Sequence, residues 1–546
     1  MVRALALDAA SFSRPSGGTT IPEQAVRARA GSRATLSDAM TAWFDGQFER
    51  CLEICSAVRA RDVAAVSELA LLRARALLRL SRPAEAHRIL NDVFVAHGTL
   101  DSSVSAQMLL GAAEVRLGDV DAGLARLEAA QIAAVCAHPT IRSEIALNRA
   151  LAHYARRDYA AATEALSRVS KDSDIIYARA LEYRGWIASA RGHSDRAALR
   201  FVAAIEHLDT CRHQDRFLET NALQKLASIA VETFDFATWD FVSDRETRID
   251  WSADGIGLAR WWVTMSAAMV SEAQGHTLRA FAIAREAERL ASSPAYRVHA
   301  LCRRARLSRN VGEAYTPADL LQQARSLFDA LPADGLRGNE RTVPLILAEE
   351  IAHAGDALGA KRLYSLYRSL DPIENVIAMS GEPDRIPYEQ LVEATIAAAS
   401  EDVSSERGVL RRALDGFRKI GYTRRAAECA LRLADLTNND RLYQYALEAT
   451  RDAAPSYWVR RFMERRERFF SDPIAQSLNG SQREVLDLIL QGRTNREIAH
   501  DRGRSVSNVK HAVTALLKAF GLRNRSELQL EAVRRFAGRT EPKTAP

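Results

Sequence analysis

Apolar and polar positions alternate along most of this chain with the period of three to four residues that is typical of amphipathic helices. Short polar turns separate these stretches, for example DGQF at 45–48, LGDVDAG at 117–123 and AGDALGA at 354–360. Only 15 prolines and 27 glycines occur among 546 residues, which favours helix almost throughout. The pattern therefore predicts an all-α protein, and the length predicts two or more structural units.

The turns recur at a regular interval along the first part of the chain. Ser81, Gly118, Arg157 and Gly192 follow one another at 37, 39 and 35 residues. Small residues flank many turns twelve positions apart, and a bulky residue often follows four positions later. The small pairs are Ala74–Ala86, Gly111–Gly123, Ala150–Ala162, Gly185–Ala197, Ala268–Ala280 and Ala348–Ala360, and the bulky residues are Leu90, Leu127, Leu166, Phe201 and Tyr364. Antiparallel helices approach closely only where both lack bulky side chains, so we predict stacked helix pairs.

This spacing resembles the tetratricopeptide repeat over about residues 35–370. The stretch LEYRGWIASARGHSDRAALRFVAAIE at 181–206 matches best, while 205–260 and 370–410 break the rhythm. The resemblance implies an α-solenoid over residues 34–468 that senses or binds a peptide, a protein or a small-molecule effector. A generic all-helical bundle is the alternative. Trp251, Trp261 and Trp262 either line a binding pocket on the repeats or pack in the core.

The remaining segments differ from the repeats. Residues 1–33 are rich in Ser, Gly and Pro and are expected to form a disordered leader, and FFSDPIAQ opens a linker over 469–477. Residues 478–538 predict a second domain of four helices, before a tail at 539–546. The four helices are expected near 480–491, from Thr494, over 506–520 and over 526–536. A capping box at Thr494–Glu497 begins the second helix, and another cap at Asn524–Glu527 begins the fourth. Glycines at 492, 521 and 538 are expected to end the first, third and fourth helices.

The third helix of this second domain has two chemically different faces. Val506, Val509, Val513, Leu516 and Phe520 form one apolar stripe. The other face carries hydrogen-bond donors and cations, namely Ser507, Lys510, His511, Thr514 and Lys518. Residues 478–546 also hold 13 Lys and Arg against 7 Asp and Glu, so the whole net charge of +6 lies at this end. A helix of this kind can enter the major groove of DNA, although a solvated basic face is the simpler alternative.

Residues 478–537 resemble the LuxR-type (GerE-like) helix-turn-helix of bacterial transcription regulators. The matching positions are Leu478, Glu484-Val485-Leu486, Gly492, Asn495, Glu497-Ile498-Ala499, Ser505, Val509-Lys510, Val513, Gly521 and Arg525. The resemblance implies double-stranded DNA as a partner, with base contacts from Lys510, His511 and Thr514. It implies phosphate contacts from Asn495, Ser505, Asn508 and Lys518, and Ser507 and Arg504 join this DNA-binding set. It also implies that Glu484 ties the helices together through a basic residue, and that a homodimer forms through the fourth helix around Leu528, Leu530 and Val533.

Several positions depart from the family pattern. Asn479 and Ser481-Gln482 stand where the family has a threonine and an Arg-Glu pair. Arg502 and Arg504 replace two apolar residues of the turn, and they either strengthen phosphate contact or weaken packing. The third helix has Asn508, Ala512 and Ala515 at positions usually held by threonine, histidine and asparagine. The leading hypothesis is a bacterial transcription regulator controlled by its repeats, and the alternative is an adaptor whose head binds DNA weakly or not at all.

Other functional classes find little support in the sequence. No nucleotide-binding loop, serine-hydrolase or metalloprotease motif occurs, so we expect neither an enzyme nor a cofactor. The six scattered cysteines predict buried thiols in a reducing, cytoplasmic setting; Cys51 and Cys55 lie one helical turn apart, which favours core packing over a metal site. No run of about 18 apolar residues occurs, so no membrane span is expected.

Overall fold

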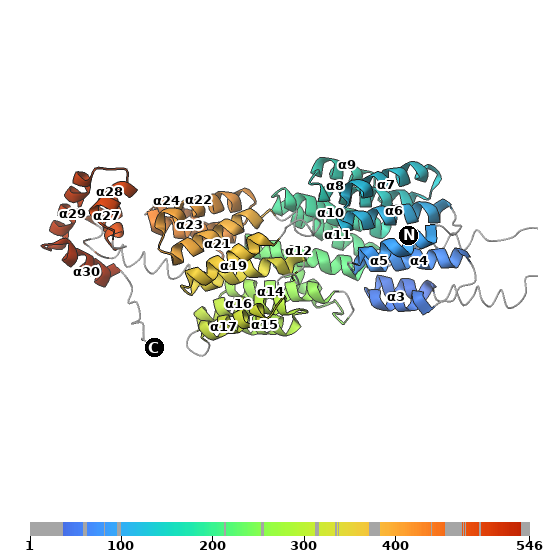
Figure 1. The fold of residues 1–546 in the computed structure, drawn as a ribbon, viewed down its shortest axis with the longest axis horizontal. Coiled ribbons are helices and arrows are strands. Elements are labelled where there is room, and N and C mark those ends of the chain that lie inside the picture. Colours follow the sequence, from blue (N-terminus) through green and yellow to red (C-terminus); the bar gives the residue numbers. More distant parts are fainter. Residues whose placement is uncertain are drawn as a thin grey trace, which may run out of the picture.

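The computed structural model describes residues 36–536, apart from 58–62, 81, 95–99, 212–214, 253–255, 312–315, 333–335, 337, 371–382, 438, 454–471, 473, 475–476 and 491–492. Every regular element within the described residues is a helix (Figure 1). The expected leader, the tail, most of the linker and the glycine stops at 492 and 538 lie outside these residues. The fold is an all-α solenoid of tetratricopeptide-like helix pairs, followed by a small four-helix head.

The solenoid begins with a helix over 36–44 and continues as antiparallel pairs. Its first half comprises α3 (Phe48–Ala57), α4 (Val63–Arg79), α5 (Pro83–Phe94), α6 (Leu100–Leu117), α7 (Val120–Ala133), α8 (Pro139–Ala155), α9 (Tyr159–Ser167), α10 (Asp174–Ala190) and α11 (Ser194–Thr210). Its second half comprises α12 (Arg216–Thr233), α13 (Phe236–Glu246), α14 (Gly257–Ala273), α15 (Thr277–Leu290), α16 (Pro294–Val311), α17 (Pro317–Asp329), α18 (Val343–His353), α19 (Ala357–Ser369), α21 (Arg385–Ala399), α22 (Val403–Lys419), α23 (Thr423–Thr437) and α24 (Asp440–Ala449).

The small residues twelve positions apart lie where the two helices of a pair meet. Alanines of all these pairs are at most 1% exposed. A Cβ added at Gly111 would lie 2.9 Å from the carbonyl oxygen of Gly123, and one at Gly185 would lie 2.8 Å from the ring of Phe201. The helices therefore approach each other as closely as the spacing predicts, backbone to backbone at Gly111 and backbone to ring at Gly185.

The bulky residues that follow the small ones fill the space toward neighbouring helices. Leu90, Leu127, Leu166 and Phe201 are completely buried. Tyr364 differs, because it is half-buried, and Tyr367 one turn later is buried instead. The phenol of Tyr367 donates a 2.6 Å hydrogen bond to Glu389, which holds it against the next helix.

The repeat continues through the two stretches in which the sequence loses its rhythm. The pairs α12–α13 and α21–α22 occupy these regions. At the close contact one partner is still alanine, since Ala227 and Ala394 are fully buried, but the residues twelve positions later are Trp239 and Glu406. These two helix pairs therefore form with one small residue at the contact, whereas the sequence pattern used two.

The turns inside the helix pairs share one backbone device. A residue with positive φ is followed by a residue at the N-cap of the second helix. Glycine fills the first position in several turns, but Arg157, Phe234 and Glu401 adopt φ of 62°, 58° and 58° there. Where that N-cap residue is an aspartate, its side chain accepts a hydrogen bond from a backbone amide in the first turn of the helix, as Asp158 does from Ala161 at 3.0 Å. The turn geometry is therefore kept even where glycine is absent.

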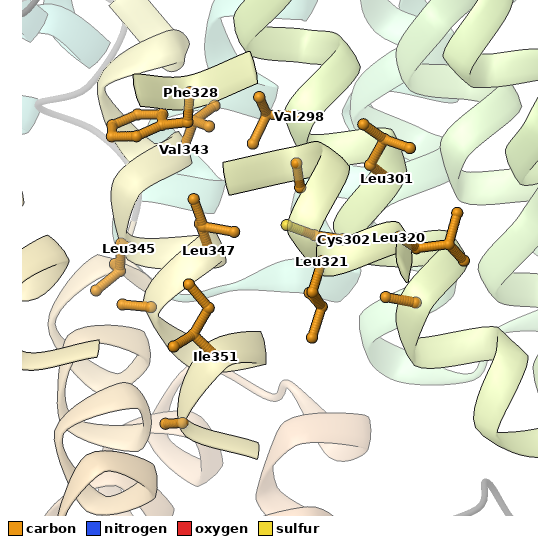
Figure 2. Close-up of a cluster of buried hydrophobic side chains, with 14 of the residues drawn as sticks. Val298, Leu301, Cys302, Leu320, Leu321, Phe328, Val343, Leu345, Leu347 and Ile351 are labelled. Carbon is orange, nitrogen blue, oxygen red and sulfur yellow. The ribbon is translucent and has the colours of Figure 1, made fainter. Parts of the chain in front are cut away.

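One large hydrophobic cluster in the second half of the solenoid extends from α14 to α21. Figure 2 shows one section, in which Leu301 and Cys302 of α16 meet Leu321 of α17 and Leu347 of α18. All four side chains are at most 6% exposed. Each helix pair thus completes its burial only against the next pair, which is the general logic of solenoids.

The second half of the solenoid also folds back on the first. The hydroxyl of Ser194, at the start of α11, donates a 2.8 Å hydrogen bond to the carbonyl of Ile420, between α22 and α23. Within the second half, Glu232 of α12 also forms an ion pair with Arg424 of α23. These two contacts join segments about 200 residues apart in sequence.

The cysteines only partly match the expectation of buried thiols. Cys51 and Cys55 are buried in the first hydrophobic cluster, next to Trp43 and Phe48, which confirms core packing. Cys302 and Cys429 are also buried, whereas Cys136 is exposed because it lies in the short 3-10 segment after α7. No helix in the described part of the chain is long and apolar enough to cross a membrane.

Candidate nucleic-acid interface

The C-terminal head lies at one end of the molecule (Figure 1) and has its own core. It consists of α27 (Gly480–Leu490), α28 (Asn495–Asp501), α29 (Val506–Phe520) and α30 (Arg525–Phe536), within about one residue of the predicted bounds. The buried side chains of the core are Leu478, Val485, Leu486, Ile489, Ile498, Ala499, Val509, Val513, Leu516, Phe520, Leu528 and Ala532. Every helix of the head contributes to this cluster, so the four helices form one packed unit.

Side chains cap the helices of the head. Thr494 and Glu497 form the expected capping box at α28. Asn479 and Gln482 form a second one at α27, because each side chain accepts a 2.9 Å hydrogen bond from the backbone amide of the other. The departure of Asn479 and Gln482 from the family pattern therefore preserves the helix start. Asn524 caps α30 by accepting from the amide of Glu527 at 2.9 Å.

The arginine in the turn between α28 and α29 has a structural partner. Arg502 donates to the carboxylate of Glu484 at 2.7 Å and to the hydroxyl of Ser481 at 3.1 Å. Its side chain is 17% exposed, so the guanidinium is largely withdrawn from solvent but compensated. Glu484 thus ties α27 to a basic residue as expected, and Arg502 does not leave an unpaired buried charge.

Helix α29 turns one face into the core and the other to solvent. Val509, Val513, Leu516 and Phe520 are buried, but Val506 is 37% exposed and lies at the rim, which corrects the predicted stripe. The predicted contact residues of the opposite face are all exposed, namely Ser507, Asn508, Lys510, His511, Thr514 and Lys518. Ala512 and Ala515 are half-buried, so these two departures from the family pattern do not lie on the exposed face.

The charge around this face has one sign. Residues 502–526 contain six Lys or Arg and no Asp or Glu. Lys510 and Lys518 project from exposed positions on α29. Gly521 adopts a φ of +68° and ends the helix, so both lysines lie on a single helix that runs from Val506 to Phe520. Such a surface has the polarity that a polyanion requires.

Three of the predicted contact residues are already engaged within the head. The side-chain oxygen of Asn495 accepts a 2.7 Å hydrogen bond from Arg525, which also donates to the carbonyl of Arg493. Ser505 caps α29 by accepting from the amide of Asn508, and Thr514 donates to the carbonyl of Lys510 in its own helix. These groups therefore also fix the arrangement of α28, α29 and α30.

Arg504 lies on the side of the head that is nearest to the solenoid. It is exposed and lines a cleft of about 310 Å³ together with Asp501 and Arg502. The opposite wall is formed by the start of α22 and the end of α23, including Arg407 and Thr437. Lys510, His511 and Thr514 do not line this cleft, so the exposed face of α29 and the cleft are separate surfaces.

The expected dimer surface on α30 is smaller than the sequence indicates. Leu528 is fully buried in the core of the head and is not available to a second chain. Leu530 is 73% exposed. The side chain of Val533 lies outside the described residues. Of the two expected dimer residues whose side chains the structure describes, Leu528 therefore serves the internal core and Leu530 stays exposed.

The three tryptophans of the solenoid do not line one pocket. Trp261 is completely buried against Tyr296, with ring centroids 4.8 Å apart, and is a core residue. Trp262 borders a cavity of about 180 Å³. Trp251 packs against a different hydrophobic cluster. A shared aromatic pocket is therefore wrong, and core packing describes Trp261.

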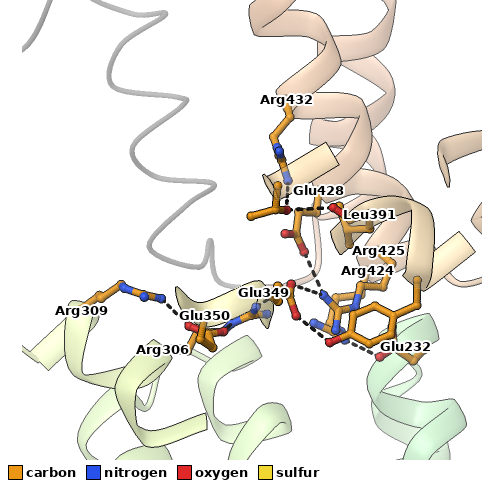
Figure 3. A network of polar contacts seen from close by, with 12 residues as sticks. Glu232, Arg306, Arg309, Glu349, Glu350, Leu391, Arg424, Arg425, Glu428 and Arg432 are labelled. Carbon is orange, nitrogen blue, oxygen red and sulfur yellow. Dashed lines mark hydrogen bonds and ion pairs between the residues drawn. The ribbon is translucent and has the colours of Figure 1, made fainter. Parts of the chain in front are cut away.

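A buried network of arginines and glutamates joins α16, α18 and α23 (Figure 3). Arg306 contacts Glu349 at 2.7 Å and Glu350 at 2.6 Å, and Arg425 contacts Glu349 at 3.3 Å. Burial by itself would raise the pKa of Glu349, but the two guanidinium groups outweigh it and hold that pKa well below its usual value. Sequence analysis missed this network because its members are scattered over more than 100 residues.

Glu349, His353 and Glu428 also approach one another closely enough to suggest a metal site. Both carboxylates, however, already contact Arg425, at 3.3 and 3.5 Å. Burial lowers the pKa of His353 to about 4, so this imidazole is neutral at pH 7. The arrangement is that of a compensated structural network, in which the arginines occupy the place a cation would take.

Comparisons with known proteins give no family assignment. No protein-family model matches the chain, and no curated protein matches it. The crystal structure of Rap protein complexed with Competence and Sporulation Factor aligns with a TM-score of 0.35 and 10% identity, over 70% of this chain and 99% of that one. The APC/C hetero-tetramer Cut9-Hcn1 aligns with a TM-score of 0.29 and 11% identity, over 92% and 96%. Overlaps this weak add nothing to the arrangement of helices described above.

Proposed function

We propose that this protein is a DNA-binding transcription regulator of the LuxR-like helix-turn-helix type. In this proposal α28 and α29 are the helix-turn-helix, and α29 is the recognition helix that enters the major groove. The observation that carries the proposal is the exposed face of α29, where Lys510, His511 and Thr514 project from a helix anchored by buried valines. Side chains placed in this way reach base edges when the helix lies in the groove.

Phosphate contacts would come from the surrounding cations and polar groups. Lys518, Asn508 and Ser507 are exposed on α29. The position of α28 relative to α30 is fixed by the hydrogen bond between Asn495 and Arg525. The lack of acidic residues over 502–526 removes the main source of repulsion for a polyanion. We assign Arg502 to the interior of the head rather than to DNA.

The test is selection of genomic DNA fragments by the full-length protein. Lys510→Ala and Lys361→Ala variants run in parallel, because both lysines are exposed and both changes remove one charge, but Lys361 lies on α19. We expect a short, roughly palindromic motif that the Lys361 variant retains and the Lys510 variant loses. Affinity should fall steeply as salt rises, and a lost base contact should cost about 1–3 kcal/mol.

Two outcomes would count against the proposal. Equal loss in both variants would mean that charge alone holds the DNA, without readout by α29. Absence of binding at low salt would leave the chain as an adaptor that uses its repeats to hold a partner. The structure offers this second function less support than the sequence did, because Arg502, one of the substituted turn residues, is paired with Glu484.

We further propose that the repeats control the head and that no reaction is catalysed. A peptide, protein or small-molecule effector would bind the solenoid, and the cleft beside Arg504 is where a change in the solenoid would reach the head. Binding to a palindromic site requires a homodimer, for which exposed Leu530 is the available apolar contact on α30. The oligomeric state with and without DNA would test that point.

A further inference from the structure

The first half of the solenoid contains a cavity of about 650 Å³. Its walls come from the first helices of four consecutive pairs, α4, α6, α8 and α10, and it is bounded by Trp43 and Phe44 at the end of the helix over 36–44. This volume lies within the range of about 300–1,000 Å³ that is usual for small-ligand sites. The cavity is far from the head in sequence and separate from the cleft at Arg504.

The cavity combines an apolar wall with arginines. Trp43 and Phe44, with leucines of α4, α6 and α8, supply the apolar part. Most of the arginines are paired, since Arg75 contacts Glu144 at 2.8 Å, and Arg79 and Arg179 share one carboxylate, that of Asp215. Two guanidinium groups at this wall therefore share the single carboxylate of Asp215.

Arg116 also lines the cavity, and it differs from the other lining arginines because no carboxylate among the described residues pairs with it. Its Nη1 donates to the carbonyl of Ala112 in its own helix at 2.9 Å, and no Asp or Glu among the described residues forms an ion pair with it. Burial lowers its pKa, yet an arginine stays protonated at neutral pH. Tyr183 lines the same cavity and stacks on Trp186, with centroids 5.0 Å apart. A half-buried cation without a counter-ion is costly unless a ligand supplies the anion.

The acidic residues at the cavity are placed so that they repel a bound anion only weakly. Asp172 and Asp174 also border it, but both are exposed, so solvent screens their charge. Glu144 is occupied by Arg75. The half-buried surface therefore favours a negative group, while the aromatic and leucine surface favours an apolar one.

We propose that this cavity binds a small organic carboxylate with an apolar body, with the carboxylate on Arg116 and Tyr183 and the apolar part against Trp43 and Phe44. The inference deepens the effector part of the proposed function, and it names the chemistry of that effector. A free aryl-alkanoic acid and the C-terminus of a short hydrophobic peptide offer the same group, so the test distinguishes these two sources.

The experiment is calorimetric titration of the full-length protein with two matched acid and amide pairs. One pair is phenylbutyrate and phenylbutyramide, and the other is the tripeptide Leu-Leu-Phe with a free or an amidated C-terminus. The variants are Arg116→Gln, Tyr183→Phe and, as the control, Arg200→Gln, because Arg200 is exposed on α11 and does not line the cavity. Circular dichroism checks that each variant is folded.

We expect at least one acid to bind, with its amide weaker by about tenfold or more. Arg116→Gln should lower the affinity for the acid to that of the amide, Tyr183→Phe should weaken it less, and Arg200→Gln should leave it unchanged. The acid that binds identifies the source. Equal binding of acid and amide, unchanged binding by the Arg116 variant, or binding of neither acid would overturn the proposal. No DNA is used, so failure here and failure of DNA binding are distinguishable.

Discussion

Replacement of Gly111 by alanine tests the close contact on which the helix pairs depend. The new Cβ would lie 2.9 Å from the carbonyl oxygen of Gly123 and 2.9 Å from Cγ of Leu127, which is completely buried. A backbone carbonyl cannot rotate away, so α6 and α7 must move apart. Overpacking of this kind costs about 1–3 kcal/mol. Alanine gains up to about 1 kcal/mol over glycine in a helix, so we expect net destabilisation of up to about 2 kcal/mol.

The matched control is Gly408→Ala in α22. Gly408 is also helical, but a Cβ there meets no heavy atom within 4 Å. The same chemical change should therefore stabilise the protein by up to about 1 kcal/mol. Urea unfolding followed by far-UV circular dichroism measures both variants, each against the wild type, because long arrays can unfold in steps.

The difference between the two variants decides the outcome. Because the gain in helix propensity is common to both variants, we expect Gly111→Ala to be less stable than Gly408→Ala by the overpacking cost of about 1–3 kcal/mol. Gly123→Ala should resemble the Gly111 variant, since its Cβ would lie 2.7 Å from the carbonyl of Gly111. If Gly111→Ala were as stable as Gly408→Ala, the helices would not meet at this point, and the account of the small-residue spacing would be refuted.

Three further predictions concern charged groups. Burial raises the pKa of Glu182 to about 8, so the native state loses stability relative to the unfolded chain as pH rises from about 4.5 to 8. In urea unfolding, Glu182→Gln should have the same free energy of unfolding as the wild type at pH 4.5 and a higher one at pH 8, by about 1.4 kcal/mol per unit of pKa shift. Equal free energies of unfolding at pH 8 would contradict this. Arg502→Ala should lower the stability of the head by up to about 1 kcal/mol because the contact with Glu484 is lost, while the salt dependence of DNA binding stays unchanged. A weaker dependence of DNA affinity on salt concentration would instead mean that Arg502 contacts a phosphate. Glu350→Gln should cost about 3–5 kcal/mol in urea unfolding because it leaves Arg306 under-compensated in a buried site, and a cost below about 1 kcal/mol would mean that the network is hydrated.

The sequence was most informative where local chemistry decides the structure. The bounds of α29, its glycine stop at 521 and the capping box at Thr494 follow from neighbouring residues, and the structure agrees with all three. The helix pairs with two small residues were equally readable. The pairs with Trp239 or Glu406 at the contact were not, because whether a large side chain fits depends on the shape of the facing helix.

The second domain illustrates the same division. Its exposed face could be predicted from helical periodicity, which sorts Lys510 and Thr514 from the buried valines. The partners of Arg502 and Asn495 could not be predicted, since they lie 18 and 30 residues away along the chain. The burial of Leu528 was also hidden, because a leucine on an amphipathic helix can face its own domain or a second copy with the same spacing.

Helical propensity, capping and periodicity act within one or two helical turns, so the pattern of residues indicates that the chain is helical, where its pairs turn, and which face of α29 is polar. How distant helices meet depends instead on the packing of the whole fold. The packing pairs Arg306 with Glu349 and Glu350, joins Ser194 to Ile420, and leaves Arg116 at the cavity with no carboxylate partner among the described residues. Electrostatic compensation and enclosure are properties of groups that meet in space, and their spacing along the chain carries no record of that meeting.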